Sequence, residues 1–220
     1  PTSSYLLRND GGVFTDVTES IFVDLQNIGM VTSAAFLDIQ NDGMPELAVT
    51  GEWMDIRIFS FDGEKFGEID QAFEDEAQTG WWFSLKKADV DNDGNMDLLA
   101  GNLGLNYKYQ ASKNSPFEVY SKDFDDNGGS DIVLGYSDGK SSYPVRGLQC
   151  SSQQIPDLKK KFPSYHEFGL ASLQDVYGKE ELGEALHHKI TDFSSAFFRN
   201  KGDGSFEKIP LPSHHNIVPS

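Results

Sequence analysis

The chain has 220 residues, 38% of them hydrophobic, so it is long enough to bury a sizeable core in one or two domains. Its formal net charge of -17 argues against nucleic-acid binding, which needs a basic face, and favours divalent cations or cationic partners. No apolar run reaches membrane-spanning length, no secretory signal is present, and the single cysteine, Cys150, cannot form an internal disulfide.

Three segments repeat one pattern along the chain. They read "AAFLDIQNDGMPELAVTG", "LKKADVDNDGNMDLLAG" and "VYSKDFDDNGGSDIVLG", and their first acids are Asp38, Asp89 and Asp123. Each predicts a strand, an acidic turn and a second strand. The uneven spacing suits propeller blades with variable outer loops better than a tight solenoid. Gly-containing turns before Phe14, Phe66 and Phe206 predict outer hairpins between the acidic turns.

Residues 154–190 interrupt this pattern with helical spacing, which predicts a helical insertion in the last blade. Ser164 and Glu167 have the spacing of a capping box, and Gly178 predicts a helix end. A further helix is predicted to place on one face Leu182, Ala185, Leu186 and Ile190. Strand signals resume at "SSAFFRN".

The acidic turns predict calcium loops. In the second loop, Asp89, Asp91 and Asp93 alternate so that a curled turn can point them inward, and Gly94 permits the bend. The predicted ligands are Asp38, Gln40, Asp42, the carbonyl of Met44 and Glu46; Asp89, Asp91, Asp93, the carbonyl of Asn95 and Asp97; and Asp123, Asp125, Asn127, the carbonyl of Gly129 and Asp131. Two to three Ca²⁺ ions are expected, with the Asp38 loop weakest because Gln replaces a carboxylate and the longer Glu replaces Asp. The alternative is that Asp-Gly turns merely connect hairpins.

Other metal motifs fit less well. An EF-hand needs Glu at the twelfth loop position, but Val49, Ala100 and Leu134 stand there. Ligands that offer only oxygen argue against zinc or copper, and the multidentate loop suits calcium better than magnesium.

The repeats resemble the FG-GAP/VCBS repeat family, the blade unit of integrin α-subunit propellers and of many bacterial surface proteins. "ADVDNDGNMDLLAGNLGLN" is similar to its calcium loop and following strand, and "FFRNKGDGSFEKIPLP" to its outer hairpin. The order of "GNLGLNYKY", "KKKFPSYHEF" and "FFRNKGDGSF" looks most like large VCBS-repeat proteins of Bacteroidetes, often linked to an ASPIC/UnbV domain. The resemblance implies a β-propeller, loop-bound calcium and an extracellular, cell-surface or periplasmic location. The Gly-Ala-Pro tripeptide and an Asp-x-Ser-x-Ser signature are absent, so integrin-type ligand binding is not implied.

The expected fold of residues 1–220 is therefore all-β, a partial β-propeller with a small helical insertion. About three four-stranded blades are expected, starting near Val31, Gly80 and Ser115, and "YLLRNDGGVFTDVTE" resembles the outer half of a preceding blade. Because propellers close with at least four blades, we expect an arc cut from a larger propeller, with the remaining blades of the parent as partners.

Three functions remain open at this level. The leading one is a noncatalytic, calcium-stabilised module for ligand binding or adhesion in an exported protein, with a protein or glycan ligand that the sequence does not identify. The second is a glycan-active lyase or hydrolase, whose candidate acids and bases are His166, His187, His188, His214 and His215. The third is a structural scaffold that docks through the helical insertion, where Lys159, Lys160 and Lys161 form a basic run.

The adjacent Trp81 and Trp82 are ambiguous. Alternating strand geometry sends one of them into the core and leaves the other for the surface, where an aromatic pair could stack on a sugar.

Overall fold

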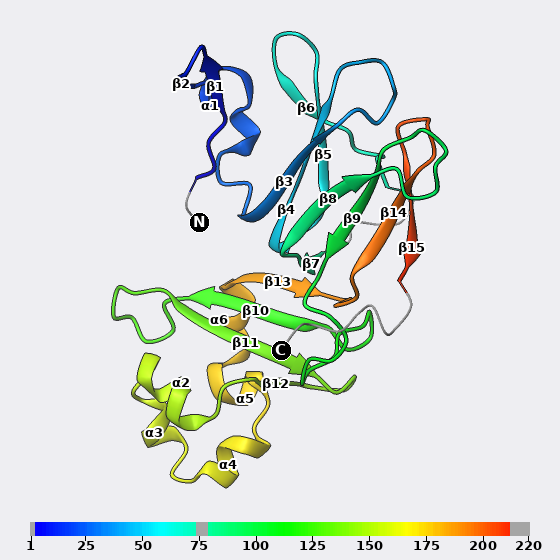
Figure 1. Cartoon of the computed structure of the whole chain (residues 1–220). Helices are drawn as coiled ribbons and strands as arrows, with labels where there is room; N and C mark the ends of the chain where they lie inside the picture. Colours follow the sequence, from blue (N-terminus) through cyan, green and yellow to red (C-terminus); the bar gives the residue numbers. More distant parts are fainter. Residues whose placement is uncertain (1–2, 74–78, 212–220) are drawn as a thin grey trace. The chain divides into compact units, whose positions relative to one another are not determined.

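A computed structural model describes residues 3–73 and 79–211 and divides the chain into two compact units (Figure 1). Unit 1 comprises residues 1–107 and 193–220, and unit 2 comprises residues 108–192, so unit 2 is inserted into the sequence of unit 1. Antiparallel sheets dominate both, which confirms the all-β prediction and is consistent with a partial propeller. No helix among the described residues is long and apolar enough to cross a membrane.

The described residues of unit 1 form three antiparallel sheets and two short helical segments. The first sheet is the hairpin β1-β2, the second has the order β3-β4-β5-β6 with β7 also paired to β4, and the third has the order β15-β14-β9-β8. Their bounds are β1 Leu7–Asp10, β2 Val13–Asp16, α1 Thr18–Ile21, η1 Val23–Leu25, β3 Met30–Leu37, β4 Glu46–Met54, β5 Arg57–Phe61, β6 Phe66–Glu68, β7 Gly80–Trp81, β8 Ser84–Ala88, β9 Asp97–Gly101, β14 Ala196–Asn200 and β15 Phe206–Pro210.

The main core of unit 1 contains side chains from both larger sheets. It joins Leu37 and Ile39, at the end of β3, to Phe198 of β14 and Phe206 of β15. Each side chain of this kind contributes about 1.5–3 kcal/mol when it is fully buried. Trp82 is 1% exposed and belongs to this core, whereas Trp81 is partly exposed and packs against Trp53. Trp82 is therefore the inward-facing tryptophan of the pair.

Unit 2 is one four-stranded sheet with the order β12-β11-β10-β13, and helices lie on one face of it (Figure 1). Its bounds are β10 Phe117–Lys122, β11 Asp131–Ser137, β12 Ser142–Pro144, α2 Leu148–Gln154, α3 Leu158–Lys161, α4 Tyr165–Leu170, α5 Leu173–Tyr177, α6 Lys179–Glu184 and β13 Leu186–Ile190. Two apolar clusters hold the helices, one among α2 to α5 and one that joins Tyr120 and Val133 of the sheet to Leu173 and Leu182.

The helical segment differs from its prediction at both ends. It begins at Leu148, before residue 154, and the predicted helix through Ile190 is wrong because α6 ends at Glu184. Leu186–Ile190 instead pairs with β10 in an antiparallel register, and these sheet hydrogen bonds override a helical spacing that extends over only a few residues.

The helix signals within the segment are partly confirmed. Ser164 caps α4 by accepting the N–H of Glu167 at 3.2 Å, but the reciprocal capping box is formed by Ser172 and Asp175 at the start of α5. Gly178, at φ +89°, ends α5 as predicted.

The hairpin after the insertion belongs to a sheet that starts much earlier in the chain. Phe197 of β14 pairs with Leu99 of β9, so β14 and β15 complete the sheet of the second acidic loop and not that of the third. Local sequence signals identify a hairpin but do not specify which distant strand it joins.

Candidate metal centre

The three acidic loops share one backbone scaffold, in which the first aspartate accepts two backbone hydrogen bonds. Asp89 accepts the N–H groups of Asp93 and Gly94, both at 3.1 Å. Asp38 and Asp123 accept the corresponding N–H groups of their own fifth and sixth loop residues at 2.7–3.1 Å. The loops therefore curl around their first carboxylate.

Two positive φ angles give this curl. The fourth residues, Asn41, Asn92 and Asp126, have φ of 56–61°, a region that Asn and Asp tolerate better than other non-glycine residues. The sixth residues are Gly43, Gly94 and Gly128, with φ of 85–92°, where a Cβ atom is strained. Asp126 is exposed, as predicted.

The ninth residue closes each loop from the start of a strand. Glu46, Asp97 and Asp131 begin β4, β9 and β11 and are 4%, 0% and 5% exposed. Each accepts the N–H of the second loop residue, at 2.8 Å for Glu46, 2.9 Å for Asp97 and 3.0 Å for Asp131. A buried carboxylate is thus held at the base of every loop.

Two of the loops bring three carboxylates together. In the triads Asp89, Asp91, Asp97 and Asp123, Asp125, Asp131, one oxygen from each residue lies within 4.8 Å of the others. Ligand distances of 2.3–2.6 Å around Ca²⁺ fit that spacing, because oxygens on opposite sides of one ion lie up to about 5 Å apart.

The electrostatics of the third loop also fit a cation. Burial raises the pKa of Asp131, and the negative charges of Asp125 and Asp123 raise it further. Oδ1 of Asp125 is buried and has no hydrogen-bond partner among the described residues. Such an oxygen carries a desolvation cost that a bound cation offsets. The donor set consists of hard oxygens, so it fits calcium.

The Asp38 loop lacks such a triad among the described residues. Its third residue is Gln40, which offers an amide oxygen where the other loops have Asp91 and Asp125. The Gln40 side chain lies beside Gly204 of the β14-β15 hairpin, where an added Cβ would be 3.3 Å from Nε2.

The fifth residues lie outside the triads. Asp42, Asp93 and Asn127 each accept the N–H of the seventh residue, at 2.8, 2.8 and 2.7 Å. Their predicted coordination, and that of the seventh-residue carbonyls of Met44, Asn95 and Gly129, stays a prediction.

Asn200 is a residue of this region that gave no clear signal in the sequence. It is 0% exposed, and its Nδ2 donates to the carbonyls of Ile39 and Met96 at 3.0 and 3.2 Å, so it joins the first two loops. Its backbone N–H donates to Asp97 at 2.9 Å. The only available hint was a polar residue at the end of the apolar run "AFFRN".

Three of the candidate histidines, His166, His187 and His188, lie among the described residues. His187 lies on β13 and not on a helix, with Nε2 3.1 Å from Oε1 of Glu118. His188 follows it on the same strand and is exposed, as is His166 on α4. His214 and His215 lie outside the described residues.

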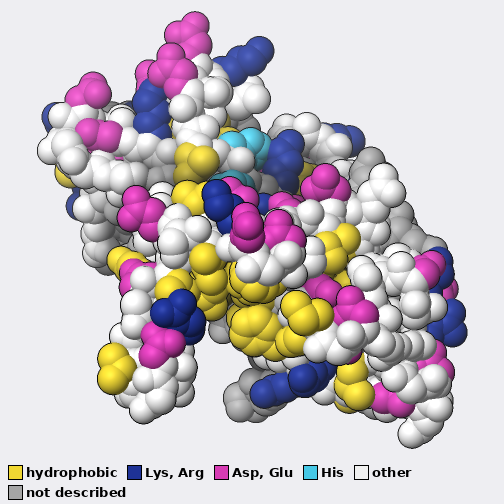
Figure 2. All heavy atoms as spheres, turned by 90° about the horizontal axis from the view of Figure 1, so that it is seen from above, with side chains coloured by type: hydrophobic (Ala, Val, Ile, Leu, Met, Phe, Trp, Pro, Cys, Tyr) yellow, Lys and Arg dark blue, Asp and Glu magenta, His cyan; other side chains and the backbone are white. Residues whose placement is uncertain are grey.

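On the face drawn in Figure 2, Asp and Glu side chains are spread over the surface, in keeping with the net charge of -17. The triads are thus distinguished by their geometry and burial and not by acidity alone.

Comparison with curated proteins and with solved structures found no match. The segment from Asp38 to Ala100, which contains the first two acidic loops and the strands that follow them, matches the family model described as FG-GAP-like repeat.

Proposed function

We propose that this chain is a calcium-binding, noncatalytic propeller-type module for ligand binding or adhesion in an exported protein. The observation that carries the proposal is the third loop, where a buried carboxylate oxygen of Asp125 has no described partner within a triad of acceptor-only groups. The second loop repeats this triad on an equal scaffold.

The role of calcium in this proposal is structural. Each triad joins a turn to the first residue of the next strand, so a bound ion holds β9 or β11 in register with its loop. The match of residues 38–100 to the FG-GAP-like repeat supports the parent propeller, and an extracellular location would supply calcium at a concentration suited to modest-affinity loops.

The test is a calorimetric titration of the chelator-stripped 220-residue chain with calcium, accompanied by thermal melts. We expect two ions per chain and a higher melting temperature with calcium than with the chelator. A parallel titration with magnesium should show weaker binding, because Mg²⁺ dehydrates reluctantly and requires octahedral geometry. No calcium binding and an unchanged melting temperature would contradict the proposal and reduce the loops to hairpin turns.

A further inference from the structure

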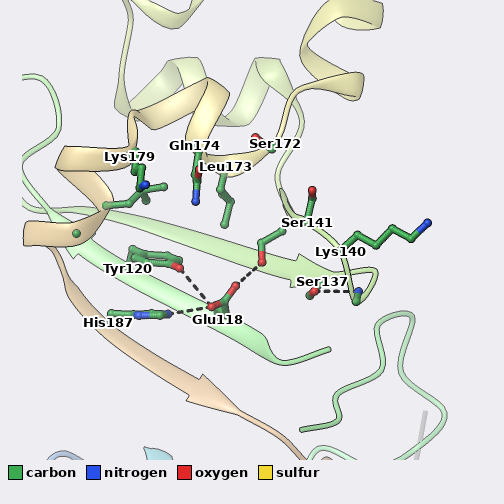
Figure 3. Close-up of a pocket in the computed structure, with 14 residues that line it drawn as sticks. Glu118, Tyr120, Ser137, Lys140, Ser141, Ser172, Leu173, Gln174, Lys179 and His187 are labelled. Carbon is green, nitrogen blue, oxygen red and sulfur yellow. Dashed lines mark hydrogen bonds and ion pairs between the residues drawn. The ribbon is translucent and has the colours of Figure 1, made fainter. Parts of the chain in front are cut away.

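Unit 2 contains a cavity of about 540 Å³ between its sheet and helices α5 and α6 (Figure 3). Glu118 and Tyr120 of β10 and His187 of β13 line it from the sheet, and Leu173 and Lys179 line it from the helices. Pockets of about 300–1,000 Å³ commonly bind small molecules. None of these residues belongs to the acidic loops.

A buried carboxylate organises the sheet side of this cavity. The Glu118 side chain is 6% exposed and accepts hydrogen bonds from Tyr120 Oη at 3.2 Å, Ser142 Oγ at 2.6 Å and His187 Nε2 at 3.1 Å (Figure 3). Nζ of Lys189 lies 3.8 Å away and partly balances the charge. The carboxylate is therefore well satisfied and holds its neighbours in place.

These bonds determine what the cavity offers to a ligand. The hydroxyl protons of Tyr120 and Ser142 and the Nε2 proton of His187 all point to Glu118, so the lone pairs of the two hydroxyl oxygens and of Nδ1 remain as acceptors. The His187 ring is stacked on Tyr120 at 4.0 Å and 10°, which fixes its orientation. Burial lowers the pKa of His187, and in a neutral ring whose Nε2 donates to Glu118 the other nitrogen, Nδ1, is an acceptor. Acceptors of this kind suit the hydroxyl groups of a ligand.

The helix side and the rim of the cavity carry positive charge, in contrast to the Glu118 carboxylate on the sheet side. Glu118, Tyr120 and His187 are the titratable side chains on the sheet side of the cavity. The other titratable side chains that line it are Lys140 and Lys179, and both are exposed. Beyond Glu118, the lining adds two lysines and no further acid, in a chain with a net charge of -17. They suit an anionic group on the outer part of a ligand. Further hydroxyl and amide groups come from Ser137, Ser141, Ser172 and Gln174.

We propose that this cavity binds an acidic sugar, with its hydroxyl groups against Tyr120, Ser142 and His187 and its carboxylate or sulfate ester at the rim, against Lys179 or Lys140, which lie at opposite ends of the cavity (Figure 3). The inference rests on the ligand-binding part of the proposed function and not on calcium. Glu118 acts in it as a positioning residue that orients the three acceptors.

The test is calorimetric titration of the full chain in calcium-containing, low-salt buffer with three probes. D-glucuronate carries a carboxylate, D-glucose 6-sulfate carries a sulfate ester, and D-glucose carries neither. We expect saturable binding of at least one anionic probe, about two- to fivefold tighter than glucose, since one ion pair at a partly exposed rim contributes up to about a factor of five. The stronger of the two anionic probes identifies the anionic group.

Two variants separate the rim from the sheet side. Replacing both Lys140 and Lys179 with Gln should weaken the anionic probe about two- to fivefold and leave glucose unchanged. Replacing Tyr120 with Phe should weaken both probes about fivefold through the loss of one hydrogen bond. The matched control is Lys159→Gln, an exposed lysine on α3 outside the cavity lining, which should change neither. General damage to the fold would not separate the two probes in this way.

Absence of saturable binding by all three probes would overturn the inference. So would an anionic probe whose affinity does not respond to the Lys140 and Lys179 replacements. A chain that binds calcium but no probe contradicts only this inference, whereas a chain that binds a probe but no calcium contradicts only the proposed role of calcium.

Discussion

The Asp38 loop and the Asp89 loop have the same backbone hydrogen bonds but a different supply of carboxylates. Both fold around the first aspartate, both have Asn with positive φ at the fourth position and Gly at the sixth, and both are closed by a buried ninth residue. Only the Asp89 loop forms a triad, because Asp91 stands where the first loop has Gln40. The turn and the capacity for an ion are therefore separate properties, carried by different residues of the same loop.

The largest loss of stability should come from replacing a residue that both closes the turn and belongs to the triad. Asp97 accepts the N–H groups of Val90 and Asn200, each at 2.9 Å, in a fully buried position. Asp97→Ala leaves both donors unsatisfied, so we expect the free energy of unfolding to fall by about 2–4 kcal/mol even with chelator present. Urea denaturation of both proteins in chelator measures this difference. An unchanged midpoint would show that the ninth residue serves only the ion.

Asp91→Asn should affect the ion alone. Asp91 is exposed, so in chelator the free energy of unfolding should stay within about 0.5 kcal/mol of the parent chain. At calcium a hundredfold above the dissociation constant, loss of the site removes about 2.7 kcal/mol. Calorimetry should then count one ion fewer. If Asp91→Asn destabilised the chelated protein as much as Asp97→Ala does, the two properties would not be separable.

Gly94→Ala tests the scaffold without changing any charge. Gly94 has φ +92° and open space where the added Cβ would lie, so the cost is backbone strain of about 1–2 kcal/mol. Gly169→Ala in α4 is the control, since it also meets no atom within 4 Å but lacks a positive φ, and it should stabilise by about 0.4–1 kcal/mol. Thermal melts in chelator compare the two. Equal effects of the two alanines would refute a strained turn.

The smallest expected effect is the gain of a calcium site. Gln40→Asp gives the first loop the carboxylate that the other two have at the third position, and calorimetry should detect one additional, weak calcium site. At calcium equal to its dissociation constant, such a site adds only about 0.4 kcal/mol. If no site appears, the longer Glu46 at the ninth position is the limiting difference between the loops.

The sequence predicted the local chemistry of these loops better than their surroundings. Gly at the sixth position, Asp126 facing solvent and the lack of an acidic triad in the first loop all follow from residues a few positions apart. The triads also require that Asp97 and Asp131 are buried, and their burial depends on the strands that these residues begin.

Long-range pairing explains what the sequence did not predict. Residues 186–190 have helical spacing but form a strand because β10 offers a partner, and Asn200 joins two loops that lie far away in the chain. Glu118 gave no signal, since a single glutamate in a strand is ordinarily exposed. Its partners become neighbours only when β10, β12 and β13 come together.

The hydrogen bond from Asn200 to Asp97 joins residues 103 positions apart, and this separation has a consequence for synthesis on the ribosome. While unit 2 is being translated, β8 and β9 have been made but β14 has not. The backbone groups of β9 that pair with β14, and the apolar residues that pack with them, are therefore exposed to solvent during this time. Chains released before β14 is made should therefore aggregate.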